Sequence, residues 1–221
     1  MPFTDELEPI LDSIVTETMA HPMVEGLGDG TLDTEPFERW VRQDYYYLKE
    51  YNRVFALGAA KAPDLDRMGR FSTLLSETLH TEMDLHRAYA AEFGITEAEL
   101  EATDPSPTTR GYTDFLVRTA SHGTFGDLVA ALLPCMWGFH ETGRRLDARG
   151  RPADDRYAEW IDTYAGEEFA ELTAWCRELM DDVAVDADPG TCERYRRLFE
   201  TSMRYEYRFW DAAWRDETWD V

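Results

Sequence analysis

Hydrophobic residues recur at intervals of three and four along most of the chain, with charged residues between them. Leu48, Tyr51 and Phe55 show this spacing within a stretch from residue 34 to 62. Side chains spaced in this way lie on one face of an α-helix. The same pattern is found over four further stretches, residues 65–94, 125–146, 154–182 and 189–219. The pattern therefore predicts long amphipathic helices.

The breaks between these stretches carry residues that begin and end helices. Thr34, Glu35 and Pro36 supply a cap, an acid and a proline at the start of the 34–62 helix. No stretch alternates apolar and polar residues between tight turns, as a β-hairpin would. The chain is therefore predicted to be all-α, a bundle of about seven or eight helices. Because it contains no repeat and no Gly/Ser linker, residues 1–221 are predicted to form a single domain.

Composition limits the partners that such a bundle takes. With 43% hydrophobic and 13% aromatic residues, the chain has enough apolar material for a packed core. Its formal net charge of −23 opposes binding to the phosphates of nucleic acids and to anionic membranes. No apolar run approaches the ~20 residues of a membrane span. We therefore expect neither nucleic acid nor a membrane as a partner.

The basic residues are unusual in kind, because 20 are arginine and only two, Lys49 and Lys61, are lysine. Acidic residues outnumber them by 45 to 22. An excess of carboxylates keeps a protein soluble in concentrated salt, where charge repulsion is screened. The composition therefore predicts a halophilic source. The alternative is an ordinary acidic protein from an organism whose codon usage favours arginine.

The cysteines and the first residues bear on the compartment. Cys135, Cys176 and Cys192 are odd in number and widely spaced, which favours neither a disulfide framework nor a zinc site. The first ten residues carry three acids where a signal peptide would have basic residues followed by an apolar run. We therefore expect reduced cysteines and a cytoplasmic location.

Two reactive residues lie within helices predicted to be partly buried. Asp44, Tyr47 and Tyr51 fall on one stripe of the 34–62 helix, so the carboxylate needs a partner there. Cys135 follows Pro134 inside the 125–146 helix. A proline within a helix removes a backbone hydrogen bond and commonly kinks the helix. The backbone around this cysteine is therefore expected to be irregular.

Glu206 is a third candidate, because four aromatic residues surround it between positions 205 and 210. Burial of a carboxyl group among aromatic rings raises its pKa, which suits a proton donor. A lone helical cysteine is usually a small core residue, and we assign that role to Cys176 and Cys192. Combined with carboxylates on two other helices, however, Cys135 favours a catalytic site.

Six stretches of the chain resemble the TenA/thiaminase II family and follow that family's order. They are HPMVEGLGDGTL from His21, QDYYYLKEYNRVFALGAAKA from Gln43, GYTDFLVRTA from Gly111, ALLPCMWGFHETGRRL from Ala131, YAEWIDTYAGEEF from Tyr157 and MRYEYRFWDAAW from Met203. The proline-cysteine pair, the aspartate after a glutamine and the glutamate before Phe-Trp form a specific combination. The resemblance implies a haem-oxygenase-like helical bundle that assembles as a homotetramer and uses no metal or organic cofactor.

The resemblance also implies hydrolysis of aminopyrimidines in thiamin salvage by covalent cysteine catalysis. The favoured substrate of the cysteine-containing subgroup is 4-amino-5-aminomethyl-2-methylpyrimidine, which yields the 5-hydroxymethyl pyrimidine and ammonia. Thiamin itself is cleaved more slowly. Cys135 matches the family's nucleophile, Glu206 its acid/base carboxylate, and Asp44 the residue that holds the pyrimidine.

Aromatic residues that line the family's site match three tyrosines, Tyr47, Tyr112 and Tyr164. One position departs from the pattern, because Phe139 stands four residues after the cysteine where many members have a tyrosine. The ring of a phenylalanine stacks on a pyrimidine as a tyrosine does, but it offers no hydroxyl contact.

Two other functions remain as alternatives. A di-iron carboxylate oxidase would use Glu-x-x-His elements, and Glu77 with His80 fits that spacing, while Glu82 and His86 lie four residues apart. No second such element is found on another helix, so a solvated helix face is the favoured interpretation of this run. The other alternative is a non-catalytic protein. A regulatory role is suggested by the family's historical name but disfavoured for DNA by the acidic charge, and a pyrimidine-binding role without catalysis is disfavoured by Cys135 and Glu206 together.

Overall fold

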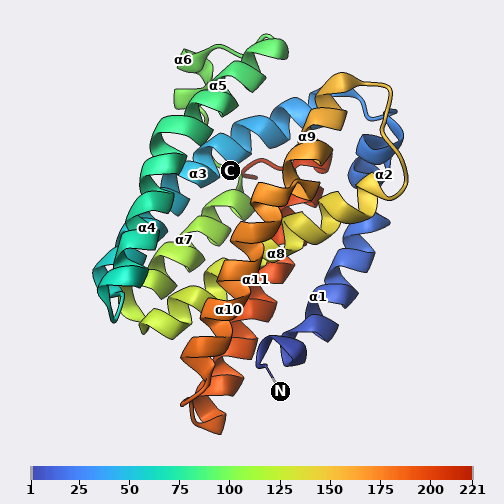
Figure 1. Cartoon of the computed structure of the whole chain (residues 1–221). Helices are drawn as coiled ribbons and strands as arrows, with labels where there is room; N and C mark the ends of the chain where they lie inside the picture. Colours follow the sequence, from blue (N-terminus) through green and yellow to red (C-terminus); the bar gives the residue numbers. More distant parts are fainter. Residues whose placement is uncertain (1, 221) are drawn as a thin grey trace. The chain divides into compact units, whose positions relative to one another are not determined.

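The computed structural model describes residues 2–220, apart from the side chains of residues 81, 82 and 85. Within these residues the secondary structure is helical and includes no strand, which confirms the predicted all-α class (Figure 1). Every helix there is too short or too polar to cross a lipid bilayer. The elements in chain order are α1 (Thr4–Met19), α2 (Pro22–Asp29), α3 (Thr34–Lys61), α4 (Leu65–Glu77), the π-helix η1 (Thr78–Glu82), α5 (Met83–Glu92), α6 (Glu97–Glu101), α7 (Pro107–His122), α8 (Phe125–Asp147), α9 (Asp155–Ala165), α10 (Glu167–Ala184) and α11 (Pro189–Arg215).

The stretch predicted as one helix over 154–182 is in fact two helices, α9 and α10. Gly166 separates them with an extended backbone, in which ψ is 161°. A Cβ at this position would lie 2.8 Å from the carbonyl oxygen of Asp162, so the chain closes tightly around the glycine. Hydrophobic residues on each side of the break keep helical spacing, which is why the pattern alone predicts a single helix.

The predicted helix over 65–94 also divides, because α4 and α5 are joined by η1. The wider turn of a π-helix requires no distinctive residue, so the sequence gives no sign of it. The last helix ends at Arg215 and does not reach residue 219, since Asp216 adopts a positive φ of 53°. Together with the short α2 and α6, these breaks give the described residues more helical segments than the about seven or eight expected of a simple bundle.

Internal contacts divide the chain into two compact units, each built from two separate stretches. The first unit is Met1–Asp33 with Val129–Asp211, and the second unit is Thr34–Leu128 with Ala212–Val221. The boundaries fall within α8 and within α11, so both helices contribute residues to both units. The single domain over 1–221 stays a prediction.

In the second unit, α3 is the element that α4, α5, α6 and α7 all contact (Figure 1). The buried face of α3 carries large side chains, among them those of Trp40, Tyr51 and Phe55. The chain after α11 also joins this unit. The carboxylate of Glu217 accepts hydrogen bonds from the N–H and the hydroxyl of Thr108 at 2.8 and 3.0 Å, which caps the start of α7.

Replacing Gly58 by alanine should destabilise the second unit, because α3 and α4 approach each other closely there. The added Cβ would lie 2.4 Å from a ring carbon of Phe71, which is fully buried. Overpacking of this kind costs about 1–3 kcal/mol of the free energy of unfolding. Thermal unfolding measures the loss, and Gly69→Ala in α4 is the control, since nothing lies within 4 Å of its added Cβ. Equal unfolding temperatures for the two variants would contradict the tight packing of α3 on α4.

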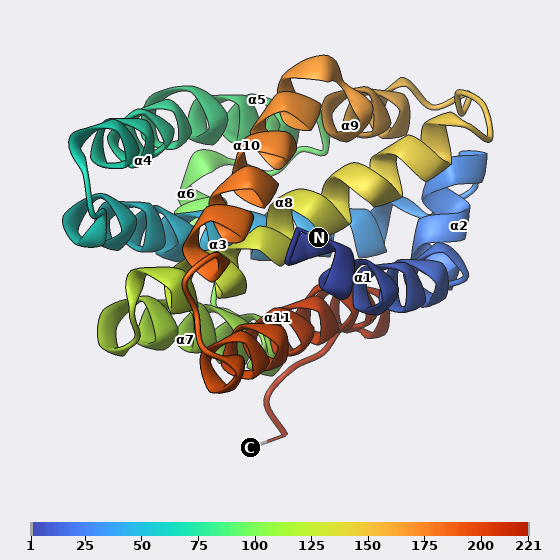
Figure 2. The ribbon, with the colours of Figure 1, turned by 60° about the horizontal axis from the view of Figure 1, so that its bottom comes forward.

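In the first unit, polar bonds anchor the two N-terminal helices. The backbone N–H and the hydroxyl of Thr4 donate to Asp181 at 2.8 and 3.0 Å. The hydroxyl of Tyr157 donates to the carbonyl oxygen of Leu32 at 2.8 Å, at the end of the segment that follows α2. Figure 2 shows α1 running beside α11, and residues of both helices line one groove. Contacts with α10 and α11 therefore hold α1 in place within this unit.

Candidate functional site

The carboxylate predicted to hold the substrate belongs to the second unit and has a partner there. Asp44 is only 6% exposed, and it lies on α3. Its Oδ2 atom lies 2.6 Å from Nε2 of His86, which is on α5. A buried carboxylate needs such a partner, because an isolated charge is costly to remove from water. The expectation that Asp44 has a partner is thus met by a histidine.

Two of the predicted tyrosines stand together in the same unit. Tyr47 follows Asp44 by one turn of α3, and its ring centroid lies 5.2 Å from that of Tyr112 on α7. The ring of Tyr51 stacks on Tyr47 at 5.1 Å. Tyr47 and Tyr112 are both buried. The second unit therefore combines a paired carboxylate with aromatic rings able to stack on a flat ligand.

The other predicted residues belong to the first unit, where α8 and α11 are in contact. The hydroxyl of Ser202 on α11 donates to the carbonyl oxygen of Ala131 on α8 at 2.8 Å. Further along both helices, the ring centroids of Phe139 and Trp210 lie 5.8 Å apart. The number of residues between the α8 member and the α11 member is the same in both pairs. The two helices therefore run in the same direction and keep one register between these contacts.

Cys135 and Glu206 lie midway between these two contacts along their helices. Cys135 lies four residues after Ala131, and Glu206 lies four residues after Ser202. Each is thus one helical turn beyond the hydrogen-bonded pair, on the same face of its helix. Glu206 is 6% exposed and Cys135 is half-buried. The thiol and the carboxyl group therefore stand at matching positions of adjacent helices.

Pro134 lies inside α8, as the sequence predicted, one residue before Cys135. It has no N–H, so the carbonyl group of Ala130 receives no helical hydrogen bond from it. The next carbonyl group, that of Ala131, accepts the hydroxyl of Ser202. The turn of α8 that leads to the cysteine is thus bonded to α11 and not only to its own helix.

Phe139 and Tyr164 are brought together in a cluster of aromatic rings in the first unit. Their ring centroids lie 5.0 Å apart, and Trp160 on α9 lies 4.5 Å from Tyr164. Phe139 therefore keeps the aromatic character of its position while lacking a hydroxyl. Trp210 completes the cluster from α11.

The position of Tyr164 is fixed by α8. Nδ1 of His140 lies 2.9 Å from the carbonyl oxygen of Tyr164, so it is the donor of a hydrogen bond to that oxygen. Gly143, one turn later, allows the close approach, because its added Cβ would lie 2.8 Å from the Cβ of Tyr164. The end of α9 is therefore held against α8 just before the break at Gly166.

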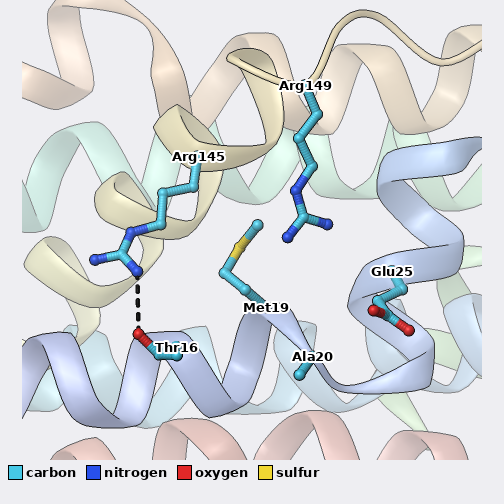
Figure 3. A pocket seen from close by; sticks show the side chains of 6 residues that line it. All are labelled: Thr16, Met19, Ala20, Glu25, Arg145 and Arg149. Atoms are coloured by element: carbon cyan, nitrogen blue, oxygen red, sulfur yellow. Dashed lines mark hydrogen bonds between the residues drawn. The ribbon is translucent and has the colours of Figure 1, made fainter.

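Two surface hollows of the first unit contain none of the predicted site residues. One, of about 390 Å³, lies where α1, α2 and α8 meet and is lined by Met19, Arg145 and Arg149 among others (Figure 3). Arg145 donates to the hydroxyl of Thr16 across it at 3.3 Å. The other, of about 650 Å³, is the groove between α1 and α11, lined by Tyr205 and Tyr207 but not by Glu206. Neither hollow is assigned to the predicted chemistry.

The Glu and His residues of the 65–94 stretch are the candidates for a metal site. Among the described residues, no group of three or more His, Cys, Asp or Glu side chains has a geometry suited to a metal ion. The side chain of Glu82 lies outside the described part of the chain. His86, which the di-iron alternative would use as a ligand, instead contacts Asp44.

His86 is the contact of Asp44 that sequence reasoning missed. The sequence favours a solvated helix face for this run, whereas the side chain of His86 is 20% exposed and paired with Asp44. The available signal was the buried carboxylate itself, which required a donor from another helix. The π-helix before α5 changes which face of α5 meets α3. Residue spacing alone therefore does not identify the donor.

The fold is shared with solved proteins. A structure described as a TenA homologue protein from P. horikoshii OT3 superposes with a TM-score of 0.90, at 28% identity, and covers 97% of this chain and 99% of the other. A domain from Shewanella denitrificans, described as having a heme oxygenase-like fold, superposes with a TM-score of 0.72 at 14% identity, covering 96% of this chain and 90% of that one. The fold is therefore haem-oxygenase-like.

Relatives in sequence identify the family within this fold. The protein named aminopyrimidine aminohydrolase from Halalkalibacterium halodurans is 44% identical over 203 residues, which are 90% of each chain. The protein of the same name from Bacillus subtilis is 36% identical over 99% of this chain and 92% of its own. The profile of the TENA/THI-4/PQQC family matches residues 4–216, and the chain belongs to this family.

Proposed function

We propose that this protein is an aminopyrimidine aminohydrolase of thiamin salvage. It converts 4-amino-5-aminomethyl-2-methylpyrimidine and water into the 5-hydroxymethyl pyrimidine and ammonia, and it cleaves thiamin more slowly. The observation that supports this most strongly is the likeness to the relatives named aminopyrimidine aminohydrolase, which extends over most of the chain. Cys135 and Glu206, at matching positions of adjacent helices, provide the thiol and the carboxyl group that such a reaction needs.

Cys135 acts as the nucleophile, as in the cysteine-containing subgroup of the family. An amine bound to the methylene group of a pyrimidine is a poor leaving group, so direct displacement by water is slow. The thiolate adds to C6 of the ring, and the resulting electron-rich adduct expels ammonia and forms an exocyclic methylene group. Water then adds to the methylene carbon, and the C–S bond breaks to restore the aromatic ring. One water molecule is consumed and one ammonia is released.

Glu206 moves the protons that this route requires. In the first half it protonates the departing nitrogen, and in the second half its carboxylate accepts a proton from the attacking water. Burial of Glu206 supports the first role, because an environment with little water favours the neutral acid. Glu206 lies one turn beyond Ser202, level with Cys135 on α8. This position supports proton transfer to the nitrogen of a substrate that is bonded to the sulfur.

Asp44, Tyr47 and Tyr112 bind the pyrimidine ring. The carboxylate of Asp44 accepts hydrogen bonds from the 4-amino group or a protonated ring nitrogen, and it orients the ring for attack by sulfur. The rings of Tyr47 and Tyr112 provide stacking faces next to it. Tyr164 and Phe139 supply further aromatic surface, and the missing hydroxyl of Phe139 changes the preference among related pyrimidines.

The test compares two products released by the purified chain in concentrated salt. Ammonia released from 4-amino-5-aminomethyl-2-methylpyrimidine and thiazole released from thiamin are measured at equal enzyme concentration. We expect both reactions, with the first the faster. Failure to release either product would overturn the proposed activity, and faster cleavage of thiamin would overturn the proposed substrate preference.

We further propose that the protein works in concentrated salt within the cytoplasm of a halophile. The net charge of −23 with only two lysines supports this. Screening of carboxylate repulsion by salt should then stabilise the fold, so we expect the unfolding temperature to rise between low salt and molar potassium chloride. Calorimetry measures this, and an unfolding temperature that stays constant or falls would exclude adaptation to salt.

A homotetramer is part of the same proposal, on the resemblance to the TenA/thiaminase II family. Sedimentation in concentrated salt measures the mass of the assembly against the 25.6 kDa of one chain. A monomer or dimer under assay conditions would overturn the tetramer without affecting the proposed chemistry.

A further inference from the structure

We propose that His86 is a positioning residue that holds Asp44 in the orientation needed to bind the pyrimidine. This inference rests on the proposed function, because Asp44 is taken to contact the substrate. His86 itself acts through Asp44 and is not a catalytic residue. It would set the affinity for the substrate, while the chemical step would remain with Cys135 and Glu206.

The contact between the two side chains is short and protected from water. Nε2 of His86 lies 2.6 Å from Oδ2 of Asp44, and the side chains are 20% and 9% exposed. Hydrogen bonds to a charged acceptor are shorter and stronger than those between neutral groups. Since one carboxylate oxygen is held by the ring nitrogen, the carboxylate loses its freedom to rotate. Its Oδ1 atom is then presented to a ligand in one fixed direction.

The neighbouring charged residues on α5 face other acids. The guanidinium group of Arg87 pairs with Asp84 at 2.7 Å and with Glu97 at 3.2 Å. Tyr45, next to Asp44 on α3, donates to Glu101 at 2.5 Å, and burial followed by this hydrogen bond raises its pKa to about 12. Adjacent residues of α3 and α5 therefore form two separate sets of contacts, one that joins Tyr45 and Arg87 to acidic residues and one between Asp44 and His86.

The π-helix η1 determines which side of α5 meets α3. Each residue of an α-helix turns the chain by about 100°, so the extra residue of a π turn rotates the following helix by a comparable angle. α5 begins immediately after η1, and His86 is its fourth residue. Because α3 contacts both η1 and α5, this rotation sets which residue of α5 meets Asp44. Segments of this kind are frequent at functional sites, which agrees with a role in substrate binding.

The experiment compares two substitutions at His86 with a control in the same helical segment. His86→Phe keeps a flat ring but removes the donor, and His86→Gln keeps an N–H at a similar distance from the backbone. We expect His86→Phe to raise the KM for the aminomethylpyrimidine about tenfold while kcat changes less than about twofold. His86→Gln should restore most of the affinity. His80→Phe is the control, because His80 is exposed on η1.

A double-mutant cycle separates positioning from general stability. Binding of the 5-hydroxymethyl pyrimidine is measured by calorimetry for the wild type, His86→Phe, Asp44→Asn and the double variant. If His86 acts through Asp44, its substitution should weaken binding in the wild type and have little further effect in Asp44→Asn. A merely structural role would instead give additive losses, with no rescue by glutamine.

The outcomes distinguish the inference from the function on which it rests. Wild-type turnover combined with an unchanged KM in His86→Phe, or with additive losses in the cycle, would overturn the role of His86 alone. Absence of turnover and of pyrimidine binding in the wild type would overturn the proposed function and this role with it. A lower kcat at constant KM in His86→Phe would also overturn it, because positioning of a binding group affects affinity.

Discussion

Replacement of Cys135 by alanine should abolish turnover of the aminomethylpyrimidine while the fold is kept. The thiolate is the only group in the proposed route that forms a bond to the ring, so no step of that route remains without it. We expect kcat to fall by at least about a thousandfold, as for the loss of other catalytic nucleophiles. Ammonia release measures the activity, and thermal unfolding measures the fold. The side chain is half-buried, so its truncation should have little effect on stability.

Cys192→Ala is the matched control, because this cysteine is also half-buried but stands in the first turn of α11. It should retain wild-type turnover. Mass spectrometry of the wild type, quenched during turnover, should detect the pyrimidine attached to the peptide that contains Cys135. Substantial hydrolysis by Cys135→Ala would exclude the covalent route and favour direct attack by water.

The class of fold could be predicted from the sequence because hydrophobic spacing is a local property. α3 and α8 begin and end within a residue of their predicted bounds, since a capped start at Thr34 and glycine or proline at their limits mark them. The break at Gly166 was missed because it depends on how closely the chain passes the Asp162 carbonyl group. That approach is a property of the folded backbone and leaves no periodic signal.

Candidate residues for the site could be named from the sequence, but the residues that contact them could not. Cys135 and Glu206 were selected by their chemistry and by resemblance, and the packing of α8 on α11 gives them matching positions. The pairing of Asp44 with His86 depends on how α5 is rotated after a π-helical turn. Spacing rules assume a constant turn per residue, so they fail at such a turn. The sequence predicts that Asp44 needs a partner, but it does not identify which residue that partner is.

Substitution of Glu206 by glutamine should lower kcat far more than it weakens binding. Glutamine keeps the size of the side chain and one carbonyl oxygen, but it neither donates a proton as an acid nor accepts one as a base. Loss of general acid-base catalysis typically lowers the rate by about a hundredfold to ten-thousandfold. KM for the aminomethylpyrimidine should stay within about threefold of the wild-type value. Asp44→Ala provides the contrast, since it should raise KM more than it lowers kcat.

The choice of substrate separates the two proton transfers assigned to Glu206. Ammonia leaves readily only when its nitrogen carries the proton, whereas the thiazole of thiamin leaves as a neutral ring and requires no acid. Both substrates share the later addition of water, for which Glu206 is the base. Glu206→Gln should therefore slow ammonia release more than thiazole release, by about tenfold or more if the acid role is real. An equal loss with both substrates would leave Glu206 as a base alone, and a raised KM at unchanged kcat would make it a binding residue.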